Sequence, residues 1–414
     1  MHPQLGISTL SLGSCEHHSL LSKLQAAARA GFTAVDLFDT DWEHFKCQYA
    51  KLNNLPLSTI DGDDTSVAAA RAINRMCASL NLSLLCLQPF REFEGRRNPE
   101  EAAERMHHAR GTLSILPVLG TSMLLIPSTT LLPSQVDSSS ARMAADLATL
   151  ADYAATFSPP LNICYEALSW GTHVSTWKAA WDVVKLADRP NLGLCLDSFN
   201  TAAREWADPY SLSGTLHPLI NDVLRASLDD LVANVPARKI FYFQLADGQR
   251  MSKPLTLPDD PAVPLLRPWS RSYRLFPLET SRGAYLPVRE FAEAIRDTGY
   301  KGPWCLEIFN DSLNESGASV PDEHARRGIE SLHKILAVVG IKGKQLRVLH
   351  MILFTDWSVI DSRSKAYAFT QLYSPIKLQK LYHFLVLFPV ASVLILVLNS
   401  LIPLSPPSRF LFFF

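Results

Sequence analysis

Three short apolar segments of this chain end in a carboxylate, and each carries a cysteine two residues before it. The segments are Asn162-Ile163-Cys164-Tyr165-Glu166, Gly193-Leu194-Cys195-Leu196-Asp197 and Pro303-Trp304-Cys305-Leu306-Glu307. A fourth apolar segment ends in the neutral oxygen ligand Gln244. Carboxylate and amide oxygens are ligands of hard divalent cations, so these four side chains would form a metal site if the fold brings them together.

Such segments, flanked by helix-like stretches, are typical of parallel strands buried on both faces. Side chains alternate along a strand, so each cysteine and the acid two residues later point the same way. In a closed barrel the cysteines would fill an inner layer and the acids would converge at the C-terminal rim, where barrel enzymes keep their active sites. Converging carboxylates repel one another unless a cation lies between them. Separate acids that cap helices or pair with arginines are the alternative.

Eight units of a strand followed by a helix can be counted before Gly340. The predicted strands lie at 5–9, 34–38, 82–87, 122–126, 161–166, 192–197, 239–245 and 303–308. The predicted helices lie at 20–30, 99–116, 139–156, 174–187, 216–235, 287–298 and 321–339. This alternation predicts an α/β fold of the (β/α)8 or TIM barrel type. A doubly wound sheet is second choice, because no glycine-rich phosphate loop follows the first strand.

The longest insertion, 247–285, follows the seventh predicted strand and contains Arg271 and Arg274, while Arg91 follows the third. Long loops inside compact domains are usually functional, so we expect this insertion to form a lid that brings cations to the rim. An arginine fork suits a substrate carboxylate, whereas a neutral sugar offers it no anion. A surface ion pair is the other interpretation of each arginine.

The overall composition indicates which classes of binding partner and which cellular compartment to expect. The chain has 414 residues, 47% of them hydrophobic, and a formal net charge of −1, with no lysine- or arginine-rich run that would predict nucleic-acid binding. Its seven cysteines form no CxxC pattern and predict free, buried thiols in a reducing compartment, with a thiolate zinc site as the lesser alternative. The N-terminus lacks a signal-peptide pattern, and we expect a cytoplasmic protein.

The chain changes character after Gly340. We expect the barrel to span 1–340 and an extra hydrophobic tail to span 341–414. Within the tail, 384–404 contains no charged residue and is long enough to be a single transmembrane segment, which would anchor the barrel to a membrane on its cytosolic side. We favour the other interpretation, a non-functional extension, because the barrel needs nothing after its eighth helix.

The chain resembles the xylose-isomerase-like barrel superfamily, and within it the fungal 3-dehydroshikimate dehydratases of quinate catabolism. The pieces that carry the resemblance are LQPFREFEG (87–95), YEALSWGTHVSTW (165–177), CLDSFNTAAREWADP (195–209), FYFQLADGQRM (241–251), WSRSYRLFP (269–277), GAYLP (283–287) and WCLEIFND (304–311). The resemblance covers most of the chain and excludes the tail.

The resemblance implies a divalent metal, Mg²⁺ or Mn²⁺ with Co²⁺ as a further candidate, held by Glu166, Asp197, Gln244 and Glu307. It also implies conversion of 3-dehydroshikimate to protocatechuate, a hydro-lyase reaction in which a base removes a proton next to the C3 carbonyl and water is lost. The groups that it assigns to substrate binding are Arg91, Ser270 and Arg274, the arginines on the carboxylate and the serine on another oxygen.

The general base of this chain must differ from that of bacterial-type relatives. Bacterial-type relatives have histidine three residues after the strand-six aspartate, where this chain has Asn200, and an amide cannot accept a proton near neutral pH. We therefore assign the base to His173, with Glu166 and Glu307 as alternatives. Asp247, three residues after Gln244, would either support a metal ligand through a hydrogen bond or cap the loop.

Two other functions stay open. A sugar or inositol epimerase or isomerase would use the same metal but would not need the arginines, and a catalytically idle barrel would explain Asn200. The predicted partner is a small cyclic hydroxy-keto carboxylate, with no nucleic acid, a membrane only if the tail is genuine, and a homo-oligomer as a further prediction.

Overall fold

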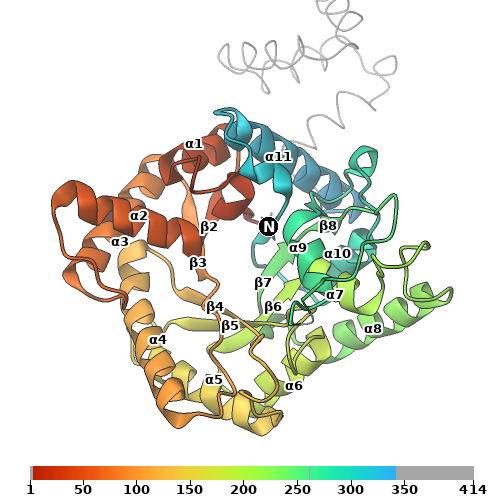
Figure 1. Cartoon of the computed structure of the whole chain (residues 1–414), viewed down its shortest axis with the longest axis horizontal. Coiled ribbons are helices and arrows are strands. Elements are labelled where there is room, and N and C mark those ends of the chain that lie inside the picture. The colour runs from red at the N-terminus through yellow and green to blue at the C-terminus, as the bar shows by residue number, and fades with distance from the viewer. Residues whose placement is uncertain (1–2, 261, 342–414) are drawn as a thin grey trace, which may run out of the picture. The chain divides into compact units, whose positions relative to one another are not determined.

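The computed structural model describes residues 3–260 and 262–341, and its centre is a closed barrel of eight parallel strands (Figure 1). The strands in chain order are β1 (Leu5–Ser8), β2 (Ala34–Phe38), β3 (Ser83–Gln88), β4 (Met123–Pro127), β5 (Asn162–Glu166), β6 (Leu192–Asp197), β7 (Ile240–Leu245) and β10 (Trp304–Leu306). Each strand pairs with its neighbours in sequence order and β10 closes the ring against β1. The predicted (β/α)8 barrel is confirmed, and each predicted strand overlaps an observed one.

Helices surround the strands in Figure 1. They are α1 (Leu20–Ala30), α2 (Asp39–Asn53), α3 (Asp64–Ser79), α4 (Pro99–Leu119), α5 (Ser140–Ala154), α6 (Trp177–Ala187), α7 (Ser198–Glu205), α8 (Ile220–Asn234), α10 (Val288–Asp297) and α11 (Val320–Val338), and a short α9 (Leu266–Ser272) lies in the insertion. The helix ranges predicted from the sequence did not include α2, α3, α7 or α9. Of these, α7 matters most, because its N-cap is the carboxylate Asp197, which accepts a hydrogen bond from the Asn200 backbone N–H at 3.0 Å.

The barrel interior contains the predicted layer of thiols. Four cysteines from four strands, Cys86, Cys164, Cys195 and Cys305, form one buried cluster with Tyr242 and neighbouring apolar side chains. None of the seven cysteines forms a disulfide, and the strand cysteines act as small core residues. Because the strand period is two, this inner layer fixes the direction of the acids that follow.

The insertion after β7 is an ordered unit. Its ends form the antiparallel pair β8 (Asp247–Gly248) and β9 (Arg274–Leu275), and α9 lies between them. Trp269 of α9 is fully buried, and a Cβ added at Gly248 would lie 2.7 Å from the Trp269 ring, so glycine is required for this packing. The insertion therefore holds Arg271 on a helix and Arg274 on a strand, and its role as a lid stays a prediction.

Asp247 closes the insertion. Its Oδ1 accepts hydrogen bonds from the backbone N–H groups of Gly248, Tyr285 and Leu286, at 2.9, 3.0 and 2.9 Å, and its Oδ2 accepts one from Leu278 at 3.2 Å. Burial raises the Asp247 pKa to about 6, although these four donors favour the ionised form. Of the two roles considered for Asp247, the structure shows loop capping.

Two glutamates of the loop after β3 bind the loop after β4, and one of them also binds strand β5. Glu92 accepts four hydrogen bonds from the segment 129–131, and the fully buried Glu94 accepts one from the Thr129 N–H at 2.7 Å and one from the Tyr165 hydroxyl at 3.0 Å. Burial raises the Glu94 pKa to about 7, and its Oε2 has no hydrogen-bond partner among the described residues. Ionisation of the Glu94 carboxyl therefore destabilises the folded state.

The predicted tail lies outside the described residues, and so do the transmembrane candidate at 384–404 and the choice between an anchor and a non-functional extension. The boundary at 340 stays a prediction. Within residues 3–260 and 262–341, no helix is long and apolar enough to cross a membrane.

Replacing Glu94 by glutamine should flatten the pH dependence of stability. A carboxyl whose folded pKa is raised from 4.5 to about 7 destabilises the fold progressively as pH rises through that window, by roughly 3 kcal/mol above pH 7. Urea unfolding at pH 5 and pH 8 should show wild type losing stability relative to Glu94→Gln at the higher pH. The exposed Glu290→Gln is the matched control and should follow wild type; equal pH dependence in all three proteins would contradict the buried charge.

Candidate metal centre and active site

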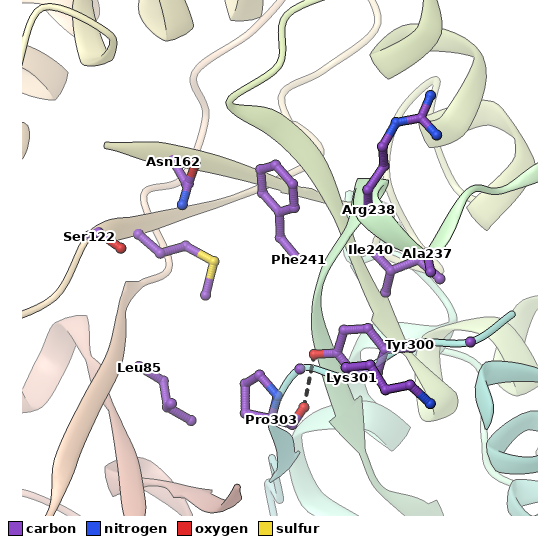
Figure 2. A pocket seen from close by; sticks show the side chains of 13 residues that line it. Leu85, Ser122, Asn162, Ala237, Arg238, Ile240, Phe241, Tyr300, Lys301 and Pro303 are labelled. Atoms are coloured by element: carbon purple, nitrogen blue, oxygen red, sulfur yellow. Dashed lines mark hydrogen bonds between the residues drawn. The ribbon is translucent and has the colours of Figure 1, made fainter. Parts of the chain in front are cut away.

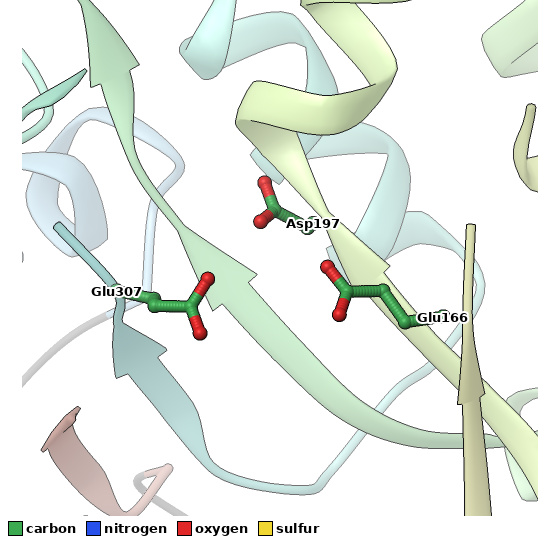
Figure 3. Close-up of side chains that lie close together, drawn as sticks. All are labelled: Glu166, Asp197 and Glu307. Atoms are coloured by element: carbon green, nitrogen blue, oxygen red, sulfur yellow. The ribbon is translucent and has the colours of Figure 1, made fainter. Parts of the chain in front are cut away.

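Three carboxylates meet at the C-terminal mouth of the barrel. Glu166 ends β5, Asp197 ends β6 and Glu307 directly follows β10, and each is 3–4% exposed. One oxygen from each lies within 4.8 Å of the others, and Figure 3 shows the three side chains directed toward a common space. The three acids are therefore not separate from one another, but the features of the alternative interpretation are also present, since Asp197 caps α7 and Arg274 pairs with Asp197 and Glu307.

The electrostatics of this triad favour a bound cation. Burial, together with the charges of Glu307 and Asp197, raises the Glu166 pKa well above its usual value. Burial raises the Glu307 pKa to about 7 even though Arg274 opposes the shift. Ionised carboxylates this close in a low-dielectric site are stable only with positive charge between them, which is the property of a metal centre.

Arg274 supplies one such charge. Its Nη1 donates to Asp197 Oδ2 at 2.8 Å and to Glu307 Oε2 at 3.2 Å, and its Nε donates to Ser270 Oγ at 3.1 Å. Burial disfavours the Arg274 cation, but the two carboxylates outweigh that effect and raise its pKa. One guanidinium against three carboxylates leaves two negative charges, which one divalent cation would balance. The residues present thus fit a divalent metal ion.

Asn200 orients two of the three carboxylates. Its Nδ2 donates to Glu166 Oε1 at 2.8 Å and to Asp197 Oδ2 at 3.1 Å, and its Oδ1 accepts from the Ser169 N–H at 3.1 Å. Both amide hydrogens are thus directed at the triad, and Ser169 fixes which way the amide faces. Sequence reasoning treated Asn200 as a lost base; the structure shows a residue that positions Glu166 and Asp197.

Gln244 lies beside Asp197 in the strand register but does not hydrogen-bond to the triad. Its Oε1 accepts from Cys195 Sγ at 3.0 Å, and its Nε2 donates to Gln88 Oε1 at 3.2 Å. The residue is fully buried at the level of the ligands, so its oxygen remains a candidate fourth ligand rather than an observed member of the cluster.

A polar layer beneath the triad was missed in the sequence. Asp36 of β2 is fully buried and its Oδ2 accepts from the Tyr242 hydroxyl at 2.9 Å and from Cys305 Sγ at 3.4 Å. Burial raises the Asp36 pKa, and the hydrogen bond from Tyr242 opposes this shift. The signal was present: Asp36 interrupts an apolar strand at an inward-facing position, where a charged residue requires partners.

Arg91 and Ser270 both lie at the mouth, in different surroundings. Arg91 forms an ion pair with Asp39, its side chain is 38% exposed, and its guanidinium carbon lies 5.6 Å from the centre of the Phe38 ring. Ser270 is fully buried next to Arg274. The structure therefore places Arg91 toward the open side and Ser270 and Arg274 against the carboxylates.

His173 lies on the loop between β5 and α6. The preceding residue, Thr172, is fixed by its N–H to Thr129 O at 2.9 Å and by its hydroxyl to Leu131 O at 2.6 Å. The His173 Nε2 atom is buried and has no hydrogen-bond partner among the described residues. No hydrogen bond within that part of the chain joins His173 to the triad, so its catalytic role stays a prediction.

One hollow of the barrel lies at the opposite end. It measures about 480 Å³ and is lined at the N-terminal ends of the strands by residues such as Ser122, Asn162, Phe241 and Pro303 (Figure 2). A second hollow, of about 180 Å³, lies beside Asp39 and Phe90 at the C-terminal end. Because TIM barrels place catalysis at the C-terminal ends of the strands, the triad rather than the larger hollow marks the site.

The family follows from comparison with known proteins. A family model described as the xylose isomerase-like TIM barrel matches residues 24–335. The chain belongs to this xylose isomerase-like TIM barrel family. A 3-dehydroshikimate dehydratase of Neurospora crassa is 39% identical over 346 residues, 81% of this chain and 94% of the relative. A Pseudomonas aeruginosa protein of the same name is 33% identical over 329 residues, which are 80% of this chain and 41% of that protein.

Solved structures of the family share the fold. A xylose isomerase-like TIM barrel/4-hydroxyphenylpyruvate dioxygenase fusion protein aligns with a TM-score of 0.60 and 28% identity over 84% of this chain, which spans 44% of that protein. The IOLI protein with a binding zinc atom aligns at 0.58 and 16% identity, covering 82% of this chain and 99% of IOLI. The second likeness concerns the fold alone. The resemblance proposed from the sequence motifs is confirmed at the level of the family.

Removing one triad charge should weaken metal binding. We expect Glu307→Gln to reduce Mn²⁺ affinity at least tenfold, since even residues that only orient a ligand cost about 10- to 100-fold when removed. Isothermal titration of chelator-stripped protein measures this directly. Glu94→Gln, which neutralises a buried carboxylate outside the triad, is the control and should bind Mn²⁺ like wild type; undiminished affinity in Glu307→Gln would exclude Glu307 as a ligand.

Proposed function

We propose that this chain is a metal-dependent 3-dehydroshikimate dehydratase, a hydro-lyase that forms protocatechuate in quinate and shikimate catabolism. The supporting observation is the buried triad of Glu166, Asp197 and Glu307 in a chain whose relatives of that name extend over four fifths of its length. The reaction removes a proton next to the C3 carbonyl, expels the β-hydroxyl as water, and ends by tautomerisation to the aromatic ring.

We assign the metal to Glu166, Asp197, Gln244 and Glu307. This all-oxygen set suits Mg²⁺ or Mn²⁺, with Co²⁺ as a further candidate. Such an ion supplies Lewis acidity toward a substrate oxygen and stabilises the enolate charge. The chain's own contribution is to hold the ligands: Asn200 fixes two of the carboxylates, and Arg274 offsets part of their charge.

His173 is the proposed general base. A neutral imidazole nitrogen accepts a proton near neutral pH, and the His173 Nε2 atom has no partner in the described structure that would compete for that lone pair. Asn200 cannot take this role, because both of its amide hydrogens are donated to carboxylates and an amide is not basic.

Arg91, Ser270 and Arg274 are the proposed substrate-binding groups. The Nη2 of the buried Arg274 donates to no described residue, while Ser270 Oγ accepts a hydrogen bond from its Nε at 3.1 Å. Arg91 is the accessible arginine at the rim. Guanidinium groups on two sides of the mouth favour an acid over the neutral polyols of a sugar or inositol epimerase.

The idle-barrel alternative lacks support. A protein without a metal would keep three buried carboxylates close together at a high electrostatic cost, and it would not need an asparagine that aligns two of them.

Chelator-stripped full-length protein should not turn over 3-dehydroshikimate, and addition of Mg²⁺ or Mn²⁺ should restore turnover. The rise in ultraviolet absorbance of the aromatic product measures the rate. A folded, metal-loaded protein without turnover would refute the proposed reaction; the same protein should then be assayed for epimerisation of neutral sugars.

His173→Gln should lower kcat by about 100-fold or more while KM changes little, because a general base acts in the transition state. The exposed His217→Gln is the matched control and should keep the wild-type kcat. Full activity in His173→Gln would show that His173 is not the general base and would leave Glu166 and Glu307 as the candidates for proton abstraction.

A further inference from the structure

Arg271 lies at the mouth of the barrel between two aromatic rings. Its guanidinium carbon is 4.1 Å from the ring centre of Phe309, which follows Glu307 by two residues, and 5.6 Å from that of Trp170. Phe309 and Trp170 come from the loops after β10 and β5, the strands that carry Glu307 and Glu166. Arg271 thus stands next to the triad on an aromatic platform.

Arg271 differs from the other two arginines of the mouth in having no anionic partner. Arg91 is paired with Asp39, and Arg274 with Asp197 and Glu307. Within residues 3–260 and 262–341, Arg271 forms neither an ion pair nor a hydrogen bond. It keeps part of its surface open, so a molecule entering the mouth can reach it.

An unpaired cation in this place is unfavourable without a ligand. Burial, and next the charge of Arg274, lower the Arg271 pKa to about 10, which leaves it charged at neutral pH. The aromatic rings stabilise the cation but offer no hydrogen-bond acceptors for its five N–H groups. An incoming anion would satisfy them, and a carboxylate matches the fork with two parallel hydrogen bonds.

We infer that Arg271 binds the carboxylate of a cyclic acid substrate, in addition to the roles proposed for Arg91 and Arg274. The ligand's charge would relieve the repulsion between Arg271 and Arg274. The identity of the acid rests on the proposed function, whereas the recognition of a carboxylate does not.

The test compares two probes that differ only in the carboxylate: protocatechuate and catechol. Isothermal titration measures both on wild type, Arg271→Gln and Arg271→Lys, with full-length, metal-loaded protein. Arg267→Gln is the matched control, since Arg267 lies exposed on the same helix. We expect Arg271→Gln to bind protocatechuate about 10- to 100-fold more weakly with unchanged catechol affinity, as befits the loss of charged hydrogen bonds. Arg271→Lys, which keeps the charge without the fork, should fall between.

Three outcomes would overturn the inference: wild-type protein that does not bind protocatechuate, equal protocatechuate affinity in wild type and Arg271→Gln, or an equal loss of both probes. The equal loss would indicate a packing role. If Arg271→Gln does not fold, an Arg271→Lys protein with unchanged protocatechuate affinity refutes the inference, and a selective loss supports it. The inference and the proposed function can fail separately. If Arg271→Gln loses the preference for protocatechuate over catechol but the wild-type protein does not turn over 3-dehydroshikimate, the inference is supported and the proposed function is rejected. If Arg271→Gln turns over 3-dehydroshikimate with the wild-type KM, the proposed function is supported and the inference is rejected.

Discussion

The repulsion among three buried carboxylates at one point is the constraint on which the mouth of this barrel depends. Glu166, Asp197 and Glu307 lie within 4.8 Å of one another at 3–4% exposure. Arg274 offsets one charge and Asn200 supplies two N–H donors, but neither removes the excess. The surroundings fix the geometry of the anions rather than neutralise them, which is the arrangement expected of a preorganised divalent-ion site.

Strand geometry explains why the triad could be predicted from sequence. Each acid lies two positions after its cysteine, so a thiol layer inside the barrel requires the acids to face the same interior one level higher. Parallel strands place their C-terminal ends on one rim, which brings Glu166 and Glu307 together across a long stretch of chain. Both predictions depend only on the two-residue period of side chains along a strand and on the parallel direction of the strands. Neither requires the conformations of the loops.

The side-chain partners could not be predicted, because they depend on loop paths and rotamers. The roles of Asn200 and Asp247 became clear only when α7 and the β8–β9 pair placed them against definite donors and acceptors. Arg274 was expected on the substrate, yet the described structure pairs it with two of the proposed ligands. A sequence motif identifies a residue near a site, but not which of its neighbours receives its hydrogen bonds.

Arg271 and Arg274 have different polar surroundings although they lie close together in one short segment. They are three residues apart, but Arg271 belongs to α9 and Arg274 to β9. Both guanidinium groups lie over the Phe309 ring, and only Arg274 also donates to the carboxylates. The barrel and the acids are set by the strands, whereas both arginines come from the insertion. Variation in that insertion could therefore change which molecule is accepted without altering the metal centre, since function in barrels resides in the loops above the strands.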